Sequence, residues 1–161
     1  MKYQPEQHGA RCDQCPRKSS QLVPPEGHPG ARWAWVGQDP GKQELKAGRP
    51  FSGSAGTRMQ HIWQAATGKA RVNVTRQEVW LTNAVLCAPV TNKEKESREA
   101  TACCRPRLLN ELRQLDPDAA VLLMGKLALL SVTGELTGGA GLMGFGMDID
   151  LKRMQQLTEE K

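Results

Sequence analysis

Five cysteines are the residues of this chain best suited to chemistry, and four of them fall into a pattern that suits a metal centre. Cys12 and Cys15 form a C-x-x-C near the start, Cys87 follows a long gap, and the adjacent pair Cys103 and Cys104 comes after it. Four thiolates from separate segments suit a [4Fe–4S] cluster or Zn²⁺, and spacing alone does not choose between them. Within the adjacent pair, we interpret Cys104 as the ligand and Cys103 as the spare.

A second candidate is the run Gly37-Gln38-Asp39-Pro40-Gly41, which directly follows a short apolar stretch. Open α/β sheets bind their ligands beyond the carboxyl ends of their strands. Bare backbone N–H groups beside one carboxylate suit recognition of a carbonyl and activation of a water. The plainer alternative is an Asp-Pro-Gly turn without a ligand.

Two further side chains suit recognition of a nucleic-acid base. Phe51 is one of two phenylalanines in the chain and sits in a polar, Gly-rich stretch, where its ring could stack on a flipped base. Asn83 comes late in an apolar stretch, and its amide offers the donor and acceptor that match the edge of a pyrimidine such as uracil. The plainer alternatives are a phenylalanine that anchors its loop and an asparagine that pairs with backbone.

The elements that must position these residues are short apolar runs alternating with helical patterns. We expect strands at Trp33–Val36, Val79–Val85 and Ala119–Met124. We expect helices around Met59–Ala66, ended by Gly68, at Arg105–Leu115, with Pro106 near its first turn, and at Lys126–Val132. This alternation predicts an α/β domain with a parallel sheet.

Four segments between and after these elements are predicted as follows. Residues 37–56 are expected to form a long ordered loop, and residues 88–97 a charged loop. The Gly-rich run 137–146 lacks the Lys-Ser/Thr of a P-loop and indicates a flexible turn. Residues 148–161 are predicted to form a C-terminal helix that begins at an Asp cap.

Length and charge set the broad class. The 161 residues fit a single domain over 1–161, for which we expect a monomer. A net charge of +5 favours a polyanionic partner such as nucleic acid, with a mildly basic surface as the alternative. We expect no membrane association, and the polar start, unlike a signal peptide, predicts an intracellular protein with reduced thiols. Lys93, Lys95 and Arg98 are the candidate DNA contacts, or else part of an ordinary solvated loop.

Several motifs, taken in order, resemble a known family. They are Gly37-Gln38-Asp39-Pro40-Gly41-x-x-Glu44, Gly48-Arg49-Pro50-Phe51-x-Gly53-x-Ala55-Gly56, Thr82-Asn83-Ala84-Val85-x-Cys87 and Cys104-x-Pro106-x-Leu108. Over residues 12–130 the chain resembles the iron–sulfur uracil-DNA glycosylases, family 4 of the uracil-DNA glycosylase superfamily. That resemblance implies a three-layer α/β/α fold with a small central parallel sheet.

The resemblance also implies an activity, hydrolysis of the N-glycosidic bond of uracil flipped out of DNA, in base excision repair. A [4Fe–4S] cluster would be held by the ligand set Cys12, Cys15, Cys87 and Cys104. Uracil would stack on Phe51 and be read by Asn83. The loop from Gly37 to Glu44 would bind the base oxygen and position the water. The implied site residues are therefore Asp39, Glu44 and Asn83 for catalysis and Gly37, Gln38, Gly41, Phe51 and Asn83 for substrate binding.

Two departures from the family pattern bear on activity. Family 4 usually has a small apolar residue at the position of Asp39, whereas the classical uracil glycosylases carry Gly-Gln-Asp-Pro with a water-activating Asp. The late His-Pro motif of the family is missing, because the three histidines, His8, His28 and His61, all precede the third predicted strand. We therefore treat residues 133–161 as a divergent or shortened tail and expect weak but real excision.

Two alternatives stay open at this stage. The first is a catalytically weak or inactive DNA- or protein-binding module on the same iron–sulfur fold. The second is a small zinc-binding α/β protein unrelated to DNA.

Overall fold

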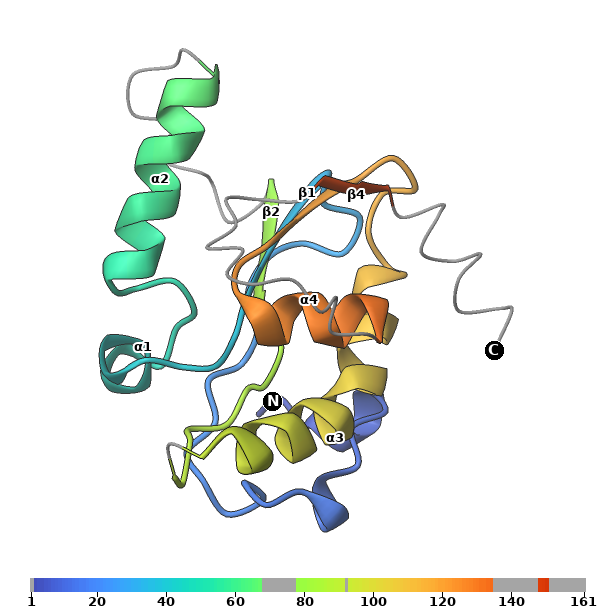
Figure 1. The fold of residues 1–161 in the computed structure, drawn as a ribbon. Coiled ribbons are helices and arrows are strands. Elements are labelled where there is room, and N and C mark those ends of the chain that lie inside the picture. Colours follow the sequence, from blue (N-terminus) through green and yellow to red (C-terminus); the bar gives the residue numbers. More distant parts are fainter. Residues whose placement is uncertain (1, 68–77, 92, 135–147, 151–161) are drawn as a thin grey trace.

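The computed structural model describes residues 2–67, 78–91, 93–134 and 148–150, and a four-stranded sheet lies at its centre (Figure 1). The strands β1 (Trp33–Gly37), β2 (Val79–Asn83), β3 (Ala120–Leu123) and β4 (Asp148–Asp150) lie in the order β2-β1-β3-β4. β1 pairs in parallel with β2 and β3, whereas β4 pairs antiparallel with β3. The three parallel strands confirm the predicted α/β class.

Helices cover both faces of this sheet (Figure 1). They are α1 (Lys42–Ala47), α2 (Ser54–Thr67), α3 (Glu94–Leu112) and α4 (Lys126–Thr133). Side chains alternate between the two faces of a strand, so Ala34 and Val36 of β1 pack in one core with α3 and α4. Trp35 points to the other face and packs with Met59 of α2. The result is the three-layer α/β/α arrangement that the resemblance implied. None of the described helices is long and apolar enough to cross a membrane.

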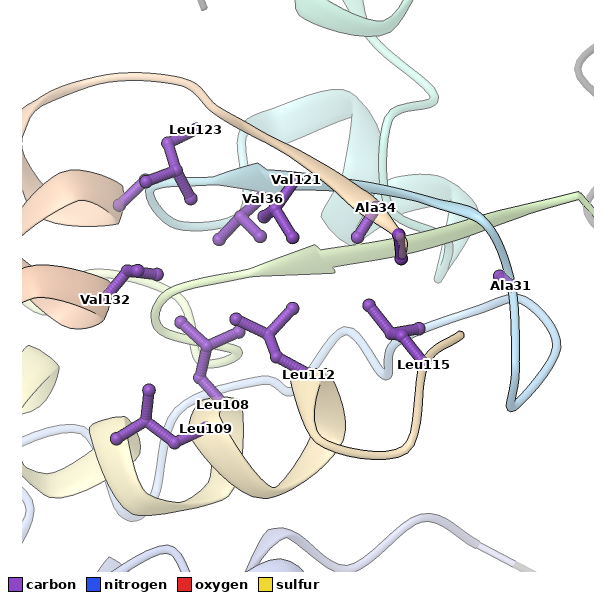
Figure 2. Close-up of a cluster of buried hydrophobic side chains, with 12 residues drawn as sticks. Ala31, Ala34, Val36, Leu108, Leu109, Leu112, Leu115, Val121, Leu123 and Val132 are labelled. Atoms are coloured by element: carbon purple, nitrogen blue, oxygen red, sulfur yellow. The ribbon is translucent and has the colours of Figure 1, made fainter. Parts of the chain in front are cut away.

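The larger core lies between the sheet and α3 (Figure 2). Leu108 and Leu112 of α3 are buried against Val36 of β1 and Val121 of β3. Each fully buried side chain of this size contributes about 1.5–3 kcal/mol relative to an exposed one. These leucines therefore form the apolar face by which α3 packs on the sheet.

The predicted start of α3 is wrong. The helix begins at Glu94, within the segment 88–97 that we expected to be a charged loop, and it continues through Pro106. Cys104 therefore lies inside a long helix rather than at the start of one. Proline inside a helix removes one N–H donor and crowds the carbonyl of the preceding turn, which costs about 3 kcal/mol.

The N-terminal segment compensates for this proline. The backbone N–H of Arg11 donates to the carbonyl oxygen of Cys103 (3.0 Å), and the Arg11 side chain donates to that of Ala102 (2.9 Å). The carbonyl of Ala102 is the one that an N–H at position 106 would have used. Arg11 thus supplies donors that Pro106 cannot, and in doing so fixes the C-x-x-C segment against the middle of α3.

Four other predictions are wrong or fall outside the described residues. Residues 37–56 are not a continuous loop, because they contain α1 and the start of α2. The carboxylate of Glu44 makes α1 possible by accepting the backbone N–H of Gly41 (2.8 Å) at the helix start. The predicted C-terminal helix is wrong for Asp148–Asp150, which pair as β4 on the sheet edge. Residues 151–161, the Gly-rich run 137–146 and Gly68 lie outside the described residues.

A buried charge network joins α3 to the end of β2. The side chain of Arg107 is fully buried and donates to the carbonyl oxygens of Asn83 (2.7 Å) and Ala84 (2.9 Å). It also pairs with Glu111 one helical turn later (2.9 Å). The hydroxyl of Tyr3 donates to the other oxygen of Glu111, so the N-terminal segment reaches this network too.

Removing the guanidinium should be costly. We expect Arg107→Met to lower the free energy of unfolding by about 3–5 kcal/mol, because it leaves Glu111 as a buried charge without its partner. Urea denaturation followed by far-UV circular dichroism measures the change. The double variant Arg107→Met/Glu111→Leu is the control and should recover part of the loss. A single variant as stable as the wild type would contradict the assigned pairing.

Candidate functional site

The carboxyl ends of β1 and β2 bring together the residues predicted to read a base. Gly37 and Asn83 are direct partners in the parallel register of these strands. A Cβ atom at Gly37 would lie 2.2 Å from Oδ1 of Asn83 and 3.5 Å from Cζ of Phe51. The amide of Asn83 therefore lies over the bare backbone of Gly37, with the edge of the Phe51 ring beside it.

The carboxylate of Glu44 holds this arrangement together. Oε1 accepts the backbone N–H of Phe51 (2.6 Å) and a longer hydrogen bond from Nδ2 of Asn83 (3.4 Å). Oε2 accepts the backbone N–H of Gly41 at the start of α1. The Glu44 side chain thus joins the asparagine amide to the backbone at Gly41 and at Phe51, on either side of α1.

Phe51 has an unusual backbone. Its φ of 56° lies in the left-handed region, which non-glycine residues adopt only when the surroundings impose it. Part of that constraint comes from Gly56, where a Cβ atom would lie 1.9 Å from the carbonyl oxygen of Phe51. The half-buried ring meets Trp35 edge-on, with 5.8 Å between the ring centres. The Phe51 ring is therefore held in place at the carboxyl ends of β1 and β2.

Asp39 is the second residue after β1, and its carboxylate is partly exposed, with 26% of the side chain accessible. Its Oδ2 accepts a hydrogen bond from Arg17 Nη1 at 2.9 Å. The side chain of the preceding residue, Gln38, points elsewhere, because its Oε1 accepts the backbone N–H of Leu127 (3.1 Å) in the first turn of α4. Gln38 thus caps α4 with its side-chain oxygen.

Three segments bring the cysteines towards one another. Cys15 and Cys104 are buried in one small cluster, with Cys103 packed against it. Burial first, and then Glu6 and the thiols of Cys104 and Cys87, raise the pKa of Cys12 to about 12. A raised pKa keeps the Cys12 thiol protonated at neutral pH, and binding of a metal would displace that proton.

Cys87 belongs to the same group. Burial first, and then the nearby Cys104 and Cys15, raise the pKa of its thiol to about 11. Among the described residues, no three His, Cys, Asp or Glu side chains are arranged to hold a single metal ion. The thiol of Cys15 also exchanges a hydrogen bond with that of Cys103, the residue that we interpreted as the spare.

Sequence reasoning missed Arg17. It is the second residue after Cys15, and its side chain is fully buried. Nε donates to Glu96 (2.6 Å), Nη1 to Asp39 (2.9 Å) and to the carbonyl of Cys87 (3.3 Å). Although burial opposes it, hydrogen bonds from Thr91 and Arg17 lower the pKa of Glu96 to about 2. No sequence signal marks this role, because most arginines lie at the surface.

The candidate DNA contacts lie at the start of α3. Lys93 is the residue before the helix, and Lys95 lies 3.9 Å from Glu99. Arg98 pairs with Glu94 at 2.8 Å. Hydrogen bonds from Lys126 and Arg98 lower the pKa of Glu94 to about 2. These basic side chains are thus interleaved with acids on one exposed helix end, rather than carried by a loop.

The close approach at Gly37 gives a test of the site geometry. We expect Gly37→Ala to displace the Asn83 amide, because the new methyl group would collide with Oδ1, and to cost about 1–3 kcal/mol of stability from the disturbed buried amide. The Asn83 side-chain resonances in a ¹H–¹⁵N spectrum should move.

The matched control is Gly41→Ala. Gly41 has an ordinary φ of −81°, and its nearest neighbour would lie 3.7 Å away, so this methyl group should leave the Asn83 resonances in place. Equal shifts in the two variants would contradict the proposed contact.

Comparison with known proteins identifies the family of this chain. Residues 24–153 match the family model of the uracil DNA glycosylase superfamily. A type-4 uracil-DNA glycosylase of Pyrobaculum aerophilum is 35% identical over 128 residues, which cover 77% of this chain and 62% of that protein. The type-4 enzyme of Thermotoga maritima is 31% identical over 115 residues, covering 70% of this chain and 56% of its own length.

A third relative matches a shorter stretch more closely. The type-4 uracil-DNA glycosylase of Sulfurisphaera tokodaii is 41% identical over 81 residues, which cover 50% of this chain and 34% of that protein. The chain thus spans between one third and two thirds of the length of these relatives. The family match covers most of the chain and includes the Asp39 turn, Phe51 and Asn83, and on this evidence the chain belongs to the uracil DNA glycosylase superfamily.

Proposed function

We propose that this protein hydrolyses the N-glycosidic bond of uracil flipped out of DNA, a reaction of base excision repair. One observation carries the proposal. The Asn83 amide, the Phe51 ring and the bare backbone of Gly37 meet at the carboxyl ends of β1 and β2, next to the turn that holds Asp39. The type-4 uracil-DNA glycosylases named above support it.

Recognition of the base would rest on Asn83. Its hydrogen bond to Glu44 is long, at 3.4 Å, so a uracil edge could replace a weak bond with two better ones. Phe51 would stack on the flipped ring, and Glu44 would keep both residues in place. An amide left unpaired by the wrong base would penalise that base strongly.

Catalysis would rest on Asp39. In the proposed reaction, a water oxygen bonds to sugar C1′ while the C1′–N1 bond breaks, the bonding electron pair leaves with the uracil, and the proton that the water loses ends on the uracil anion. A carboxylate held by Arg17 through one oxygen can orient the water through the other and stabilise positive charge developing on the sugar. In this scheme Gly37, Gln38 and Gly41 offer backbone groups to the base oxygen, and the N–H of Gly41 would have to exchange its bond to Glu44 for one to the base.

A [4Fe–4S] cluster on Cys12, Cys15, Cys87 and Cys104 completes the proposal, with Zn²⁺ as the alternative. Cys15 and Cys104 lie in one buried cluster, and neighbouring thiols, after burial, raise the pKa of Cys12 and of Cys87, which supports a shared centre. A cluster does not require cysteines gathered around one ion, because each cysteine binds a different iron. Its contribution here would be to stabilise the fold.

DNA is the proposed partner, and Lys93, Lys95 and Arg98 stay the proposed contacts. Their place at an exposed helix end suits phosphate binding through both side chains and backbone N–H groups. Glu94 and Glu99 would have to release their basic partners, or share them, when a phosphate approaches.

Single-turnover excision with protein in excess tests the proposed function. We expect uracil release from uracil-containing single- or double-stranded DNA, with Asp39→Asn slowing it by a factor of about 10²–10⁴. Asn83→Ala should abolish release while keeping fold and general DNA affinity.

Asp118→Asn is the matched control, because it makes the same change in the turn before β3, at the opposite end of the sheet. A folded wild-type sample with its cluster that releases no uracil above the no-protein blank would favour a non-catalytic binding module instead.

The cysteine assignment has its own test. After anaerobic reconstitution with iron and sulfide, we expect brown wild-type protein with broad visible absorbance. Cys104→Ala should lose this absorbance and unfold at lower temperature, whereas Cys103→Ala should do neither, because only Cys104 is proposed as a ligand. A bleached Cys103→Ala variant would reverse the assignment, and a colourless, zinc-containing wild type would replace the cluster with Zn²⁺.

A further inference from the structure

The guanidinium of Arg17 is placed between the proposed metal centre and the proposed water-activating residue. It has no solvent exposure, and all three of its nitrogens donate hydrogen bonds. On one side Nη1 holds Oδ2 of Asp39. On the other, the Arg17 backbone N–H donates to Sγ of Cys15 (3.4 Å), and Nη1 also reaches the carbonyl oxygen of Cys87 (3.3 Å).

The remaining bonds fix the guanidinium itself. Nε donates to Oε1 of Glu96 at 2.6 Å, and Nη2 donates to the hydroxyl of Ser97 at 3.0 Å. Both partners belong to the first turn of α3. With its plane fixed by a strand end, a helix and a cysteine segment, the guanidinium has little freedom to move away from Asp39.

We propose that Arg17 is the positioning residue of Asp39, and that it joins the alignment of this carboxylate to the segments that carry Cys15 and Cys87. The inference rests on the proposed function of Asp39. Asp39 lies two residues beyond the end of β1 and is partly exposed, so its side chain would otherwise be free to rotate. Held at Oδ2, it keeps one orientation towards the cleavage site, and losing such alignment can slow a reaction greatly.

Arginine suits this task in a way that lysine does not. Its planar fork donates in several fixed directions at once, whereas an ammonium group is a compact charge on a flexible stem. Lysine at position 17 would keep the positive charge near Asp39 and Glu96 but could not retain every bond at the observed geometry. Arg17→Lys therefore separates charge from alignment.

The first measurement is single-turnover uracil release by the wild type, Arg17→Lys, Asp39→Ala and the double variant. We expect Arg17→Lys to slow cleavage about tenfold or more, with the half-saturating DNA concentration unchanged. Added to Asp39→Ala, the same substitution should slow cleavage no further, because Arg17 acts through Asp39. Arg32→Lys, at an exposed position, is the matched control and should keep the wild-type rate.

The inference is overturned if the double variant releases uracil more slowly than Asp39→Ala by the same factor that Arg17→Lys alone causes. An unchanged rate in Arg17→Lys would overturn it too. A wild type without uracil release would instead refute the proposed function, and thermal unfolding of the same four proteins then decides whether the link exists. If Arg17 and Asp39 are coupled, the double variant should melt no lower than the less stable single variant. Losses in melting temperature that add up in the double variant would overturn the link.

A second readout covers an Arg17→Lys variant that does not fold. Asp39→Ala touches no cysteine, yet it should alter the visible circular dichroism of the reconstituted cluster by releasing Arg17, whose N–H contacts Cys15. An unchanged spectrum in a folded Asp39→Ala protein would overturn the inference.

Discussion

The cost of removing a charged guanidinium from water determines how the separate segments of this protein meet. Arg17 and Arg107 are both fully buried, and a buried charge persists only when hydrogen-bond acceptors surround it. Arg17 gathers acceptors from the end of β1, from the segment after β2 and from α3. Arg107 gathers them from the end of β2 and from its own helix. The two strand ends that form the candidate site are thus each fastened by one arginine.

These arginines also tie the candidate site to the cysteines through the chain itself. Arg17 comes two residues after Cys15, and Arg107 three residues after Cys104. A shift of either cysteine would carry a buried arginine with it, and through that arginine a strand end. Glu44 works on a smaller scale within the site, since one carboxylate serves Gly41, Phe51 and Asn83.

Sequence patterns predicted the parts of this structure that depend on local periodicity. The three parallel strands and α4 were foreseen because buried strands and amphipathic helices leave repeating apolar residues. The path of α3 through Pro106 was not foreseen, since the donor that makes it tolerable, Arg11, lies far away in sequence. β4 was not predicted for a similar reason, because its three residues form a strand only through their pairing with β3.

The residues of the candidate site also fall into those that the sequence predicted and those that it did not. Asp39, Phe51 and Asn83 could be named in advance because strand ends and Gly-rich loops are visible in a sequence, and the structure brings all three to one edge of the sheet. Arg17 and Glu96 could not, because charged residues are normally exposed and only the folded chain reveals which of them are enclosed.

The hydrogen bonds that Arg11 donates to α3 come from outside the segment that the family model matches. The family match begins at residue 24, yet Tyr3, Arg11 and Arg17 all lie before it and donate into the interior. A chain cut at the similarity boundary would lose the donors that Arg11 offers to carbonyl groups in the middle of α3, and one donor each to Glu111, Glu96 and Asp39. The opening residues therefore support the core structurally, although they lie outside the segment that the family model matches.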